Sequence, residues 1–179
     1  MIGLKRGTVK LVSHDSKWAE LFEEEQQLLI DTFGGTIIAI EHVGSTAIPG
    51  IPTKPIIDIN IGVRSLEVAL GMKDRFEEIG YEHRPFVPGH TFEDLKAQEL
   101  YAKGPDAKRT HYVHVTVYGS DFWNRALLFR DYLRCNTNRA KEYANLKEKL
   151  AQEYPEDRRS YSMNKAQFII QTLKMAKKI

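Results

Sequence analysis

The sequence lacks the features that mark secreted and membrane proteins. Cys135 is the only cysteine in 179 residues, so no disulfide can form within the chain and a reducing compartment is expected. The first residues, Met1-Ile2-Gly3-Leu4-Lys5-Arg6, lack the apolar core of a signal peptide, and no apolar run approaches the length of a membrane span. We therefore expect a cytoplasmic protein that does not enter a membrane.

An excess of either charge is also absent. The 26 basic and 24 acidic residues leave a net charge of +2, so no global field draws the chain to nucleic acid, although a local basic site stays open. No basic patch interleaved with aromatic residues stands out, and nucleic acid is not expected as a partner. The length and the 42% of hydrophobic residues suit one compact domain over residues 1–179.

Hydrophobic periodicity and turn residues predict strands mainly before Tyr118 and helices after it. The pattern predicts an α+β fold with a mixed β-sheet flanked by helices and a helical C-terminal half. The Glu23-Glu24-Glu25 run is interpreted as a solvated helix face. The expected helices are 16–33, 65–79, 120–134, 137–153 and 160–177, and the expected strands are 37–43, 56–63, 81–86, 99–103 and 110–118, after a lead-in strand or extended arm at 9–12.

The most informative stretch runs from residue 41 to residue 61. The first strand stops at Gly44-Ser45-Thr46, and after a loop rich in glycine and proline a strongly β-forming run carries Asp58. Glycine lets the backbone approach a bound group, and the amides and hydroxyls of Ser45 and Thr46 can donate to phosphate oxygens. The layout favours a phosphate cradle, although a lone Gly-Ser is more often an ordinary turn.

Side-chain alternation in the second strand places Asp58 and Asn60 on one face and the isoleucines at 57, 59 and 61 on the other. An unpaired aspartate in such an apolar strand would be costly. Asp58 is therefore a candidate metal or substrate ligand, or else a structural carboxylate that accepts loop amides or pairs with a buried arginine.

Four blocks of sequence together resemble the GrpB family, which belongs to the nucleotidyltransferase-fold superfamily. The resemblance runs from about residue 9 to about residue 170. It rests on His42-Val43-Gly44-Ser45-Thr46-Ala47-Ile48-Pro49-Gly50, Lys54-Pro55-Ile56-Ile57-Asp58-Ile59, His111-Tyr112-Val113-His114-Val115 and Phe129-Arg130-Asp131-Tyr132-Leu133-Arg134.

That superfamily carries a Gly-Ser pair, a strand with two acidic residues and a third carboxylate on a neighbouring strand. Gly44-Ser45 and Asp58 match this pattern, but Asn60 replaces the second acid and the neighbouring strand carries His111 and His114. Two divalent ions need several anionic oxygens between them, so the departure speaks against the usual two-metal transfer. A single Mg²⁺ or Mn²⁺ on Asp58 and His114 is the metal site that we predict, with Zn²⁺ as another option.

The remaining candidates are cations and a second histidine. His111 and His114 are three apart on a strand and point to opposite faces, so they cannot easily share a metal. Lys54 and Arg109 are candidate phosphate or aspartate partners, or else solvated loop charges. Arg130 is a candidate phosphate ligand, or else it pins its helix to the sheet through a buried acid. The resemblance implies a recurring lysine at Lys165, which could otherwise be a surface lysine.

Three functions follow as hypotheses. The first is a protein that binds a nucleoside triphosphate with a divalent metal and transfers a nucleotidyl group to an unknown small acceptor. In it Asp58, Asn60 and His114 form the catalytic centre, and Gly44, Ser45, Thr46, Lys54, Arg109, Arg130 and Lys165 bind the substrate. The second is a non-catalytic nucleotide- or cofactor-binding module related to CoA metabolism, because the resemblance includes domains fused to dephospho-CoA kinase. The third is a hydrolase with one transition metal on His114, His42 and Asp58.

Overall fold

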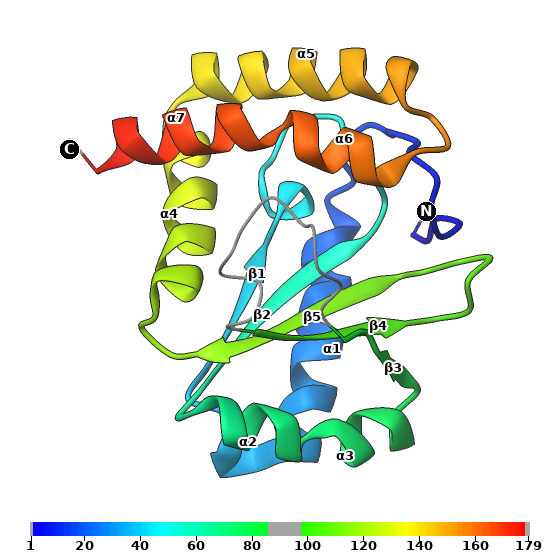
Figure 1. The fold of residues 1–179 in the computed structure, drawn as a ribbon, viewed down its shortest axis with the longest axis vertical. Helices are drawn as coiled ribbons and strands as arrows, with labels where there is room; N and C mark the ends of the chain where they lie inside the picture. The colour runs from blue at the N-terminus through cyan, green and yellow to red at the C-terminus, as the bar shows by residue number, and fades with distance from the viewer. Residues whose placement is uncertain (1, 86–97, 178–179) are drawn as a thin grey trace.

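Five strands form a single mixed sheet at the centre of the protein (Figure 1). The structure is a computed structural model that describes residues 2–85 and 98–177. The strand order is β1-β2-β5-β4-β3; among these described strands β2 and β5 pair in parallel, and the other neighbours pair antiparallel. The strands are β1 (Ala39–Val43), β2 (Ile57–Val63), β3 (Tyr81–His83), β4 (Gln98–Lys103) and β5 (His111–Val117).

One face of this sheet carries the main hydrophobic core. The isoleucines at 57, 59 and 61 are fully buried there, beneath α1 (Lys17–Phe33), α2 (Leu66–Gly71) and α3 (Lys73–Glu78). Trp18 and Phe76 supply the large aromatic surfaces of this core, which is where most of the hydrophobic stabilisation is expected. The alternation predicted for β2 is confirmed, because its apolar residues face the helices and Asp58 and Asn60 face away from them.

The opposite face of the sheet meets α4 (Asp121–Cys135). Ser120 caps this helix, and its Oγ accepts a hydrogen bond from the backbone N–H of Trp123. Tyr118, just after β5, and Trp123 of α4 come so close to β2 that a Cβ atom on Gly62 would lie 2.8 Å from the Tyr118 ring and 3.1 Å from the Trp123 ring. Gly62 is therefore required for this packing.

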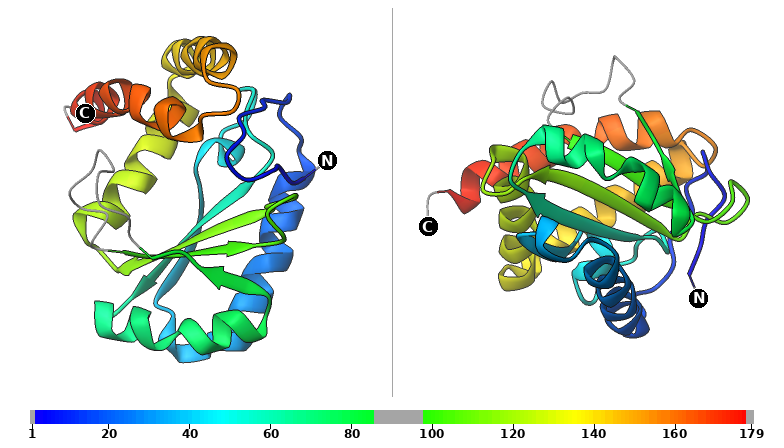
Figure 2. Two further views of the ribbon diagram at one scale, coloured as in Figure 1. Left: turned by 45° about the vertical axis from the view of Figure 1, so that its right-hand side comes forward. Right: turned by 90° about the horizontal axis from the view of Figure 1, so that it is seen from below.

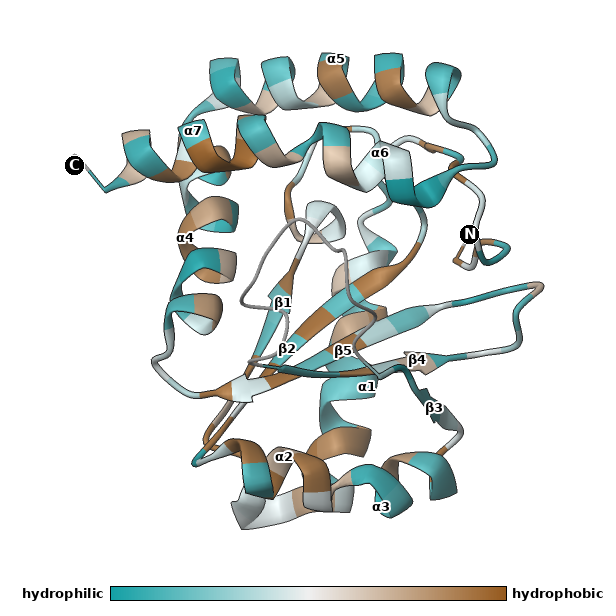
Figure 3. Cartoon of the chain, in the orientation of Figure 1, coloured by the Kyte–Doolittle hydropathy of each residue, from teal (hydrophilic) through white to brown (hydrophobic). Residues whose placement is uncertain are grey.

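The C-terminal helices stack at one end of the sheet, away from α2 and α3 (Figure 2). They are α5 (Thr137–Glu153), α6 (Arg158–Asn164) and α7 (Ala166–Ala176). Ile48 and Ile51, in the connection between β1 and β2, pack with Leu133, Tyr143 and other residues of α4 and α5 in a second apolar cluster. The outer turns of α5 are mostly hydrophilic, whereas β2 is mostly hydrophobic (Figure 3).

The N-terminal arm links the sheet to the helical layer. Gly3 N–H donates to Pro55 O (2.8 Å) and Val12 N–H to Thr53 O (2.8 Å), both in the loop before β2. On the other side, Val9 N–H donates to Pro155 O (2.7 Å) and Arg158 N–H to Gly7 O (3.1 Å). The predicted lead-in strand is thus an extended arm, with an isolated bridge at Val12.

Several element boundaries differ from the sequence-based expectation. The first strand begins at Ala39 because Gly34–Thr36 form a 3-10 turn (η1), and the strand at 81 ends at His83. The helix expected at 65–79 is broken at Met72, and the last helix is broken at Lys165. His90 and most of the ambiguous segment 92–98 lie outside the described residues.

The prediction of a solvated glutamate run is wrong for Glu25, which is only 6% exposed. Its carboxylate accepts hydrogen bonds from Lys103 Nζ (2.7 and 2.8 Å) and from the Tyr81 hydroxyl (2.9 Å). His111 Nε2 lies 3.9 Å away. Side chains from β3, β4 and β5 thus surround the buried carboxylate of Glu25. These strands are distant from α1 in sequence, so a local sequence pattern cannot reveal the cluster.

Candidate functional site

A small pocket lies where the connection between β1 and β2 meets the helical layer. Its volume is about 120 Å³, and we call it the Lys165 pocket. Its walls come from both parts of the protein: Gly44, Ser45, Thr53, Lys54, Ile56 and Asp58 on the sheet side, and Tyr143, Arg158, Tyr161 and Lys165 on the helical side. Five of these residues, Gly44, Ser45, Lys54, Asp58 and Lys165, are among those that the sequence predicted for a site.

Gly44 brings its loop into close contact with the acidic strand. Its φ of +70° and ψ of −169° form a backbone conformation open essentially to glycine alone. A Cβ atom at this position would lie 2.9 Å from Asp58 Cβ and 3.0 Å from Asp58 Cγ. Gly44 therefore lets Ser45 and Asp58 line the same pocket.

Two lysines from opposite sides of the pocket share one aromatic ring. Lys165 Nζ lies 4.4 Å from the centre of the Tyr161 ring and Lys54 Nζ lies 5.4 Å from it. Cation–π attraction stabilises both ammonium groups by about 0.5–2 kcal/mol each. This attraction does not supply a hydrogen-bond acceptor. Neither Lys54 Nζ nor Lys165 Nζ donates a hydrogen bond to any of the described residues.

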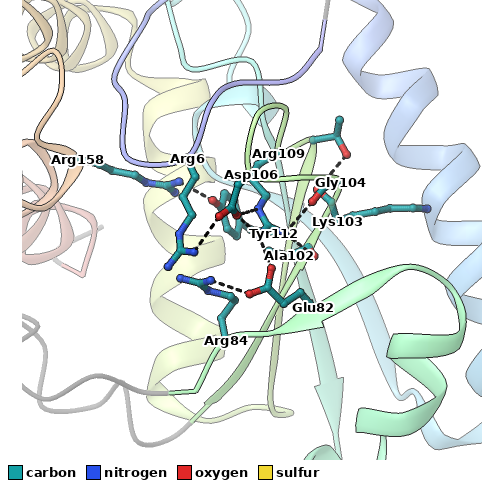
Figure 4. Close-up of polar contacts among 11 residues, drawn as sticks. Arg6, Glu82, Arg84, Ala102, Lys103, Gly104, Asp106, Arg109, Tyr112 and Arg158 are labelled. Atoms are coloured by element: carbon teal, nitrogen blue, oxygen red, sulfur yellow. Dashed lines mark hydrogen bonds and ion pairs between the residues drawn. The ribbon is translucent and has the colours of Figure 1, made fainter.

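Arg158 is held in the pocket by Tyr112 of β5. Its Nη1 donates to the Tyr112 hydroxyl at 2.6 Å, and the guanidinium carbon lies 4.5 Å from the centre of the same ring (Figure 4). Tyr112 is paired with Asp58 in the β2–β5 ladder. The sheet therefore positions a helical-side cation close to the acidic residue.

A fourth cation lies behind the pocket wall. Lys147 is 1% exposed, and its Nζ donates to Pro52 O at 2.5 Å, next to Thr53 and Lys54. Burial, with Lys165 nearby, lowers the pKa of Lys147 to about 7. Burial, with Arg158 nearby, lowers the pKa of Lys165 to about 8, although Asp58 opposes this shift.

The lysine in the sheet-side loop has the same character. Burial, together with Arg158 and Lys165, lowers the pKa of Lys54 well below its usual value, and Asp58 again opposes the shift. Within residues 2–85 and 98–177, no carboxylate lies within ion-pair distance of Lys54, Lys147, Arg158 or Lys165. The pocket thus concentrates positive charge around the single carboxylate of Asp58.

Two tyrosines complete the polar lining. Burial raises the pKa of Tyr143 to about 12, and its hydrogen bond with the Ser45 side chain opposes the shift. Tyr161 is fully buried, and its hydroxyl has no hydrogen-bond partner among the described residues. An unpaired buried hydroxyl is costly, so this group is a donor available to a bound ligand.

Asn60 and His114 lie one step further along the same face of the sheet. They are paired in the β2–β5 ladder, and Asn60 is fully buried. Asn60 Oδ1 accepts from Thr116 Oγ1 at 3.4 Å, and His114 Nδ1 bonds Gln98 Oε1 at 2.7 Å. Burial lowers the pKa of His114 while Asp58 raises it, so the imidazole is neutral near pH 7.

Thr46 and Arg109 lie outside the pocket. Thr46 Oγ1 bonds His42 Nε2 at 3.0 Å and is 3% exposed. Arg109 forms ion pairs with Glu82 and Asp106 and donates to Gly104 O at 2.7 Å (Figure 4). These contacts tie the guanidinium to β3 and to the β4–β5 turn, so Arg109, a phosphate ligand in the sequence-based prediction, does not line the Lys165 pocket.

Arg130 also lies elsewhere. Its Nη1 donates to Glu41 Oε2 at 2.6 Å and to His42 O at 2.8 Å, and its Nε donates to Asp131 Oδ1 at 2.7 Å. These contacts fasten α4 to β1, as the alternative given for this residue from the sequence expected, but the paired acids Glu41 and Asp131 are partly exposed rather than buried. The adjacent Asp131 takes part because the guanidinium turns back along the helix.

The described residues do not fit a two-metal centre. Asp58 is the only carboxylate that lines the pocket, and the described part of the chain contains no group of three His, Cys, Asp or Glu side chains able to hold a metal ion. Two-metal transfer needs several anionic oxygens between the ions. Asn60, fully buried and bonded to Thr116, stands where a second acid would be needed.

A transition-metal site on His114, His42 and Asp58 is not formed either. His42 stacks on Phe22 of α1, with ring centres 4.8 Å apart, on the face of the sheet opposite to Asp58. Neighbouring residues along a strand alternate faces, and the register pairs His42 with Ile59 rather than with Asp58. His42 therefore cannot share one metal ion with His114 and Asp58, as the hydrolase hypothesis requires.

Sequence reasoning missed Arg158, Tyr143 and Tyr161 as pocket residues. Arg158 follows the Pro155–Asp157 break, which predicted only a helix start. Tyr143 lies inside an amphipathic helix, where an aromatic residue normally indicates core packing. Only the docking of α5 and α6 onto the loop at 53–56 turns these three side chains toward Asp58.

A mixed sheet flanked by helices, with a Gly-Ser turn that faces an aspartate on the next strand, is the fold that the resemblance to a nucleotidyltransferase-like family predicted. A model of the GrpB protein family matches residues 8–175. The chain belongs to the GrpB family.

Known proteins similar to this chain support the assignment. The glutamate-rich protein GrpB of Alkalihalophilus pseudofirmus is 41% identical over 177 residues, which are 97% of this chain and 98% of that protein. The crystal structure of the conserved protein GrpB from Enterococcus faecalis superposes with a TM-score of 0.81 at 36% identity, over 94% of this chain and 98% of that one. The mixed sheet flanked by helices that the sequence predicted is confirmed.

A more distant similarity connects the chain to part of a larger enzyme. A dephospho-CoA kinase of Mycobacterium leprae is 30% identical over 158 residues, which are 76% of this chain and 38% of that protein. This chain thus corresponds to well under half of that kinase.

No helix among the described residues is both long and apolar enough to cross a bilayer.

Proposed function

We propose that the chain binds a nucleotide or a nucleotide-derived cofactor, with the phosphate groups of the ligand in the Lys165 pocket. The observation that carries this proposal is the convergence of Lys54, Arg158 and Lys165 on one cavity, where no carboxylate among the described residues lies within ion-pair distance of any of them. A phosphate carries negative charge and accepts hydrogen bonds. It would therefore neutralise these cations and also accept hydrogen bonds from their N–H groups.

The dimensions of the pocket support the phosphate end of the ligand as its occupant. A cavity of about 120 Å³ is smaller than the roughly 300–1,000 Å³ typical of sites that enclose a drug-sized ligand. One or two phosphate groups fit, and a nucleoside must extend out of the pocket. Gly44 and Ser45 border it on the sheet side, as the phosphate cradle predicted from the sequence requires.

Two classes of ligand are consistent with this arrangement. A nucleoside triphosphate is the ligand implied by the nucleotidyltransferase-like fold. A phosphorylated CoA-type cofactor is suggested by the similarity to part of a dephospho-CoA kinase. Both ligands present terminal phosphates to the pocket. They differ in the part of the molecule that extends out of it.

The side chains that line the pocket favour ligand binding without catalysis. Asn60 is buried and bonded to Thr116 in place of a second acid, so the described residues offer a ligand many cations and only one carboxylate. Cations hold phosphates in the ground state, whereas two-metal transfer needs anionic oxygens to hold the metals.

Nucleotidyl transfer to a small acceptor is the second candidate. It is favoured by the close packing of Asp58 against Gly44, which puts an acid beside a potential phosphate cradle. In that case a divalent ion such as Mg²⁺ or Mn²⁺ would be held by Asp58 and the ligand's own phosphates. This candidate predicts release of pyrophosphate.

The test is a ligand panel measured by thermal shift and by calorimetry. ATP, GTP, CTP, UTP, CoA and dephospho-CoA are titrated with Mg²⁺ and with EDTA, and pyrophosphate release is followed in parallel. We expect at least one ligand to bind and Lys165→Met to weaken it about tenfold or more, because a charge-assisted hydrogen bond is lost. Lys174→Met, on an exposed lysine of α7, is the control.

Equal affinities in Lys165→Met, Lys174→Met and wild type would contradict the proposal. So would a panel in which no ligand binds. Binding accompanied by pyrophosphate release would establish the second candidate instead of the non-catalytic module.

A further inference from the structure

The Lys165 pocket offers an unusual number of hydrogen-bond donors without acceptors. The ammonium groups of Lys54 and Lys165 have no hydrogen-bond partner in the described part of the chain, and the Tyr161 hydroxyl has none either. Arg158 uses Nη1 on Tyr112 and has further N–H groups in its planar fork. A ligand that only accepts hydrogen bonds would satisfy these groups better than water, which must also donate.

Two of these charges lie around the same aromatic ring. Lys54 comes from the loop before β2 and Lys165 from the junction between α6 and α7, yet both ammonium groups contact the Tyr161 ring. The two nitrogen atoms cannot lie further apart than the sum of their distances to the ring centre. Lys165 helps to lower the pKa of Lys54, which means that the two charges repel each other, so a counter-charge between them would be favoured.

We propose that the Lys165 pocket binds the terminal phosphate of its ligand as a dianion without a divalent metal, and that Lys54, Arg158 and Lys165 provide the charge that a metal supplies in related folds. This inference rests on the proposed function and identifies the binding group as a phosphate monoester or the end of a diphosphate. Asp58 does not carry a metal in this arrangement. It limits the repulsion among the cations while the pocket is empty.

The same arrangement couples ligand binding to protonation. Burial lowers the pKa of Lys165 to about 8 and that of Lys147 to about 7, and also lowers the pKa of Lys54. A bound anion opposes these shifts and raises all three pKa values. The charged groups that act on these lysines are Arg158 and Asp58 around the pocket and Glu148 beside Lys147, and the lining tyrosines have raised pKa values that keep them neutral at pH 8.

The experiment is calorimetric titration of the full chain with inorganic pyrophosphate and with inorganic phosphate at pH 8. Each titration is run in EDTA and in excess Mg²⁺, and in two buffers that differ in ionisation enthalpy. We expect binding in EDTA and a net uptake of protons. Excess Mg²⁺ should leave the affinity unchanged or weaken it, because the ion competes for the anion.

Asp58→Asn separates the two arrangements. If lysines hold the phosphate, loss of the nearby negative charge leaves pyrophosphate affinity within about twofold or strengthens it. If Asp58 holds a metal, the same substitution abolishes Mg²⁺-dependent binding. Lys54→Met and Lys165→Met should each weaken binding in EDTA about tenfold or more, with Lys174→Met as the control.

Each result has a defined meaning for this inference. Binding that requires Mg²⁺ and fails in Asp58→Asn overturns it, while nucleotide binding itself would stand. Binding of pyrophosphate in EDTA, combined with failure of every nucleotide and CoA compound, supports it and overturns the proposed ligand class. If one lysine variant fails to fold, the other lysine variant and Asp58→Asn still decide.

Discussion

The carboxylate of Asp58 packs directly against the α-carbon of Gly44, so closely that no side chain larger than hydrogen fits between the two backbones. This contact joins the end of β1 to the second residue of β2. It fixes the distance between the Gly-Ser loop and Asp58, the only acidic residue among the described ones that line the Lys165 pocket. The strand ladder supports it, because Val43 is the register partner of Asp58.

Gly44→Ala is expected to destabilise the protein by about 2–4 kcal/mol. The new methyl group would meet Asp58, and φ of +70° is strained for alanine. Urea unfolding measures the loss.

Gly50→Ala is the matched control, because Gly50 also has a positive φ (+79°) but nothing lies within 4 Å of a Cβ atom there. It should cost about 1 kcal/mol through backbone strain alone. Equal losses in the two variants would show that the Asp58 contact has no energetic weight.

Tyr112→Phe is expected to weaken pyrophosphate binding about three- to tenfold with a small change in stability. The Phe ring keeps the stacking surface under Arg158, but Arg158 Nη1 loses its 2.6 Å hydrogen bond and its fixed orientation. Calorimetry measures the affinity, and Arg158→Met should lose more. An affinity equal to wild type in Tyr112→Phe would mean that Tyr112 does not position Arg158.

Arg130→Lys is expected to destabilise the protein by about 1–3 kcal/mol without changing ligand affinity. Lysine cannot reproduce the forked contacts to Glu41, His42 O and Asp131 that hold α4 on β1. Chemical unfolding and a ligand titration of the same variant give the two quantities. Reduced affinity in fully folded Arg130→Lys would restore Arg130 as a ligand-binding residue.

His42 is expected to make the protein sensitive to acid. Burial, with Arg134 and Arg130 nearby, lowers the pKa of His42 to about 4, below the ordinary value of 6.5 for an unfolded chain. Between these two values the unfolded chain binds more protons than the native protein, so stability falls as the pH drops from about 6.5 to about 4.

His42→Gln should reduce this loss by roughly 2–3 kcal/mol, because one pKa unit corresponds to about 1.4 kcal/mol. The measurement is the free energy of unfolding of both proteins at pH 7 and pH 4.5. Glutamine should cost stability at pH 7, where the stacking on Phe22 and the bond to Thr46 are lost. Parallel acid profiles for the two proteins would assign the sensitivity to other groups.

Local patterns in the chain determined the sheet, most helix positions and one side of the pocket. Alternation placed Asp58 and Asn60 on one face of β2, turn chemistry placed Gly44 and Ser45 at the end of β1, and four sequence blocks indicated the GrpB family. These features depend on neighbours within a few residues, so a linear reading can detect them.

Only the tertiary structure decided which charged groups meet. It pairs Arg109 with Glu82 and Arg130 with Glu41. It buries Glu25 against Lys103 and Tyr81. By packing α5 and α6 on the loop at 53–56, it also brings Arg158, Tyr143 and Tyr161 into the pocket that Asp58 lines. Such contacts join segments up to about a hundred residues apart, and their energy depends on burial that no local pattern encodes.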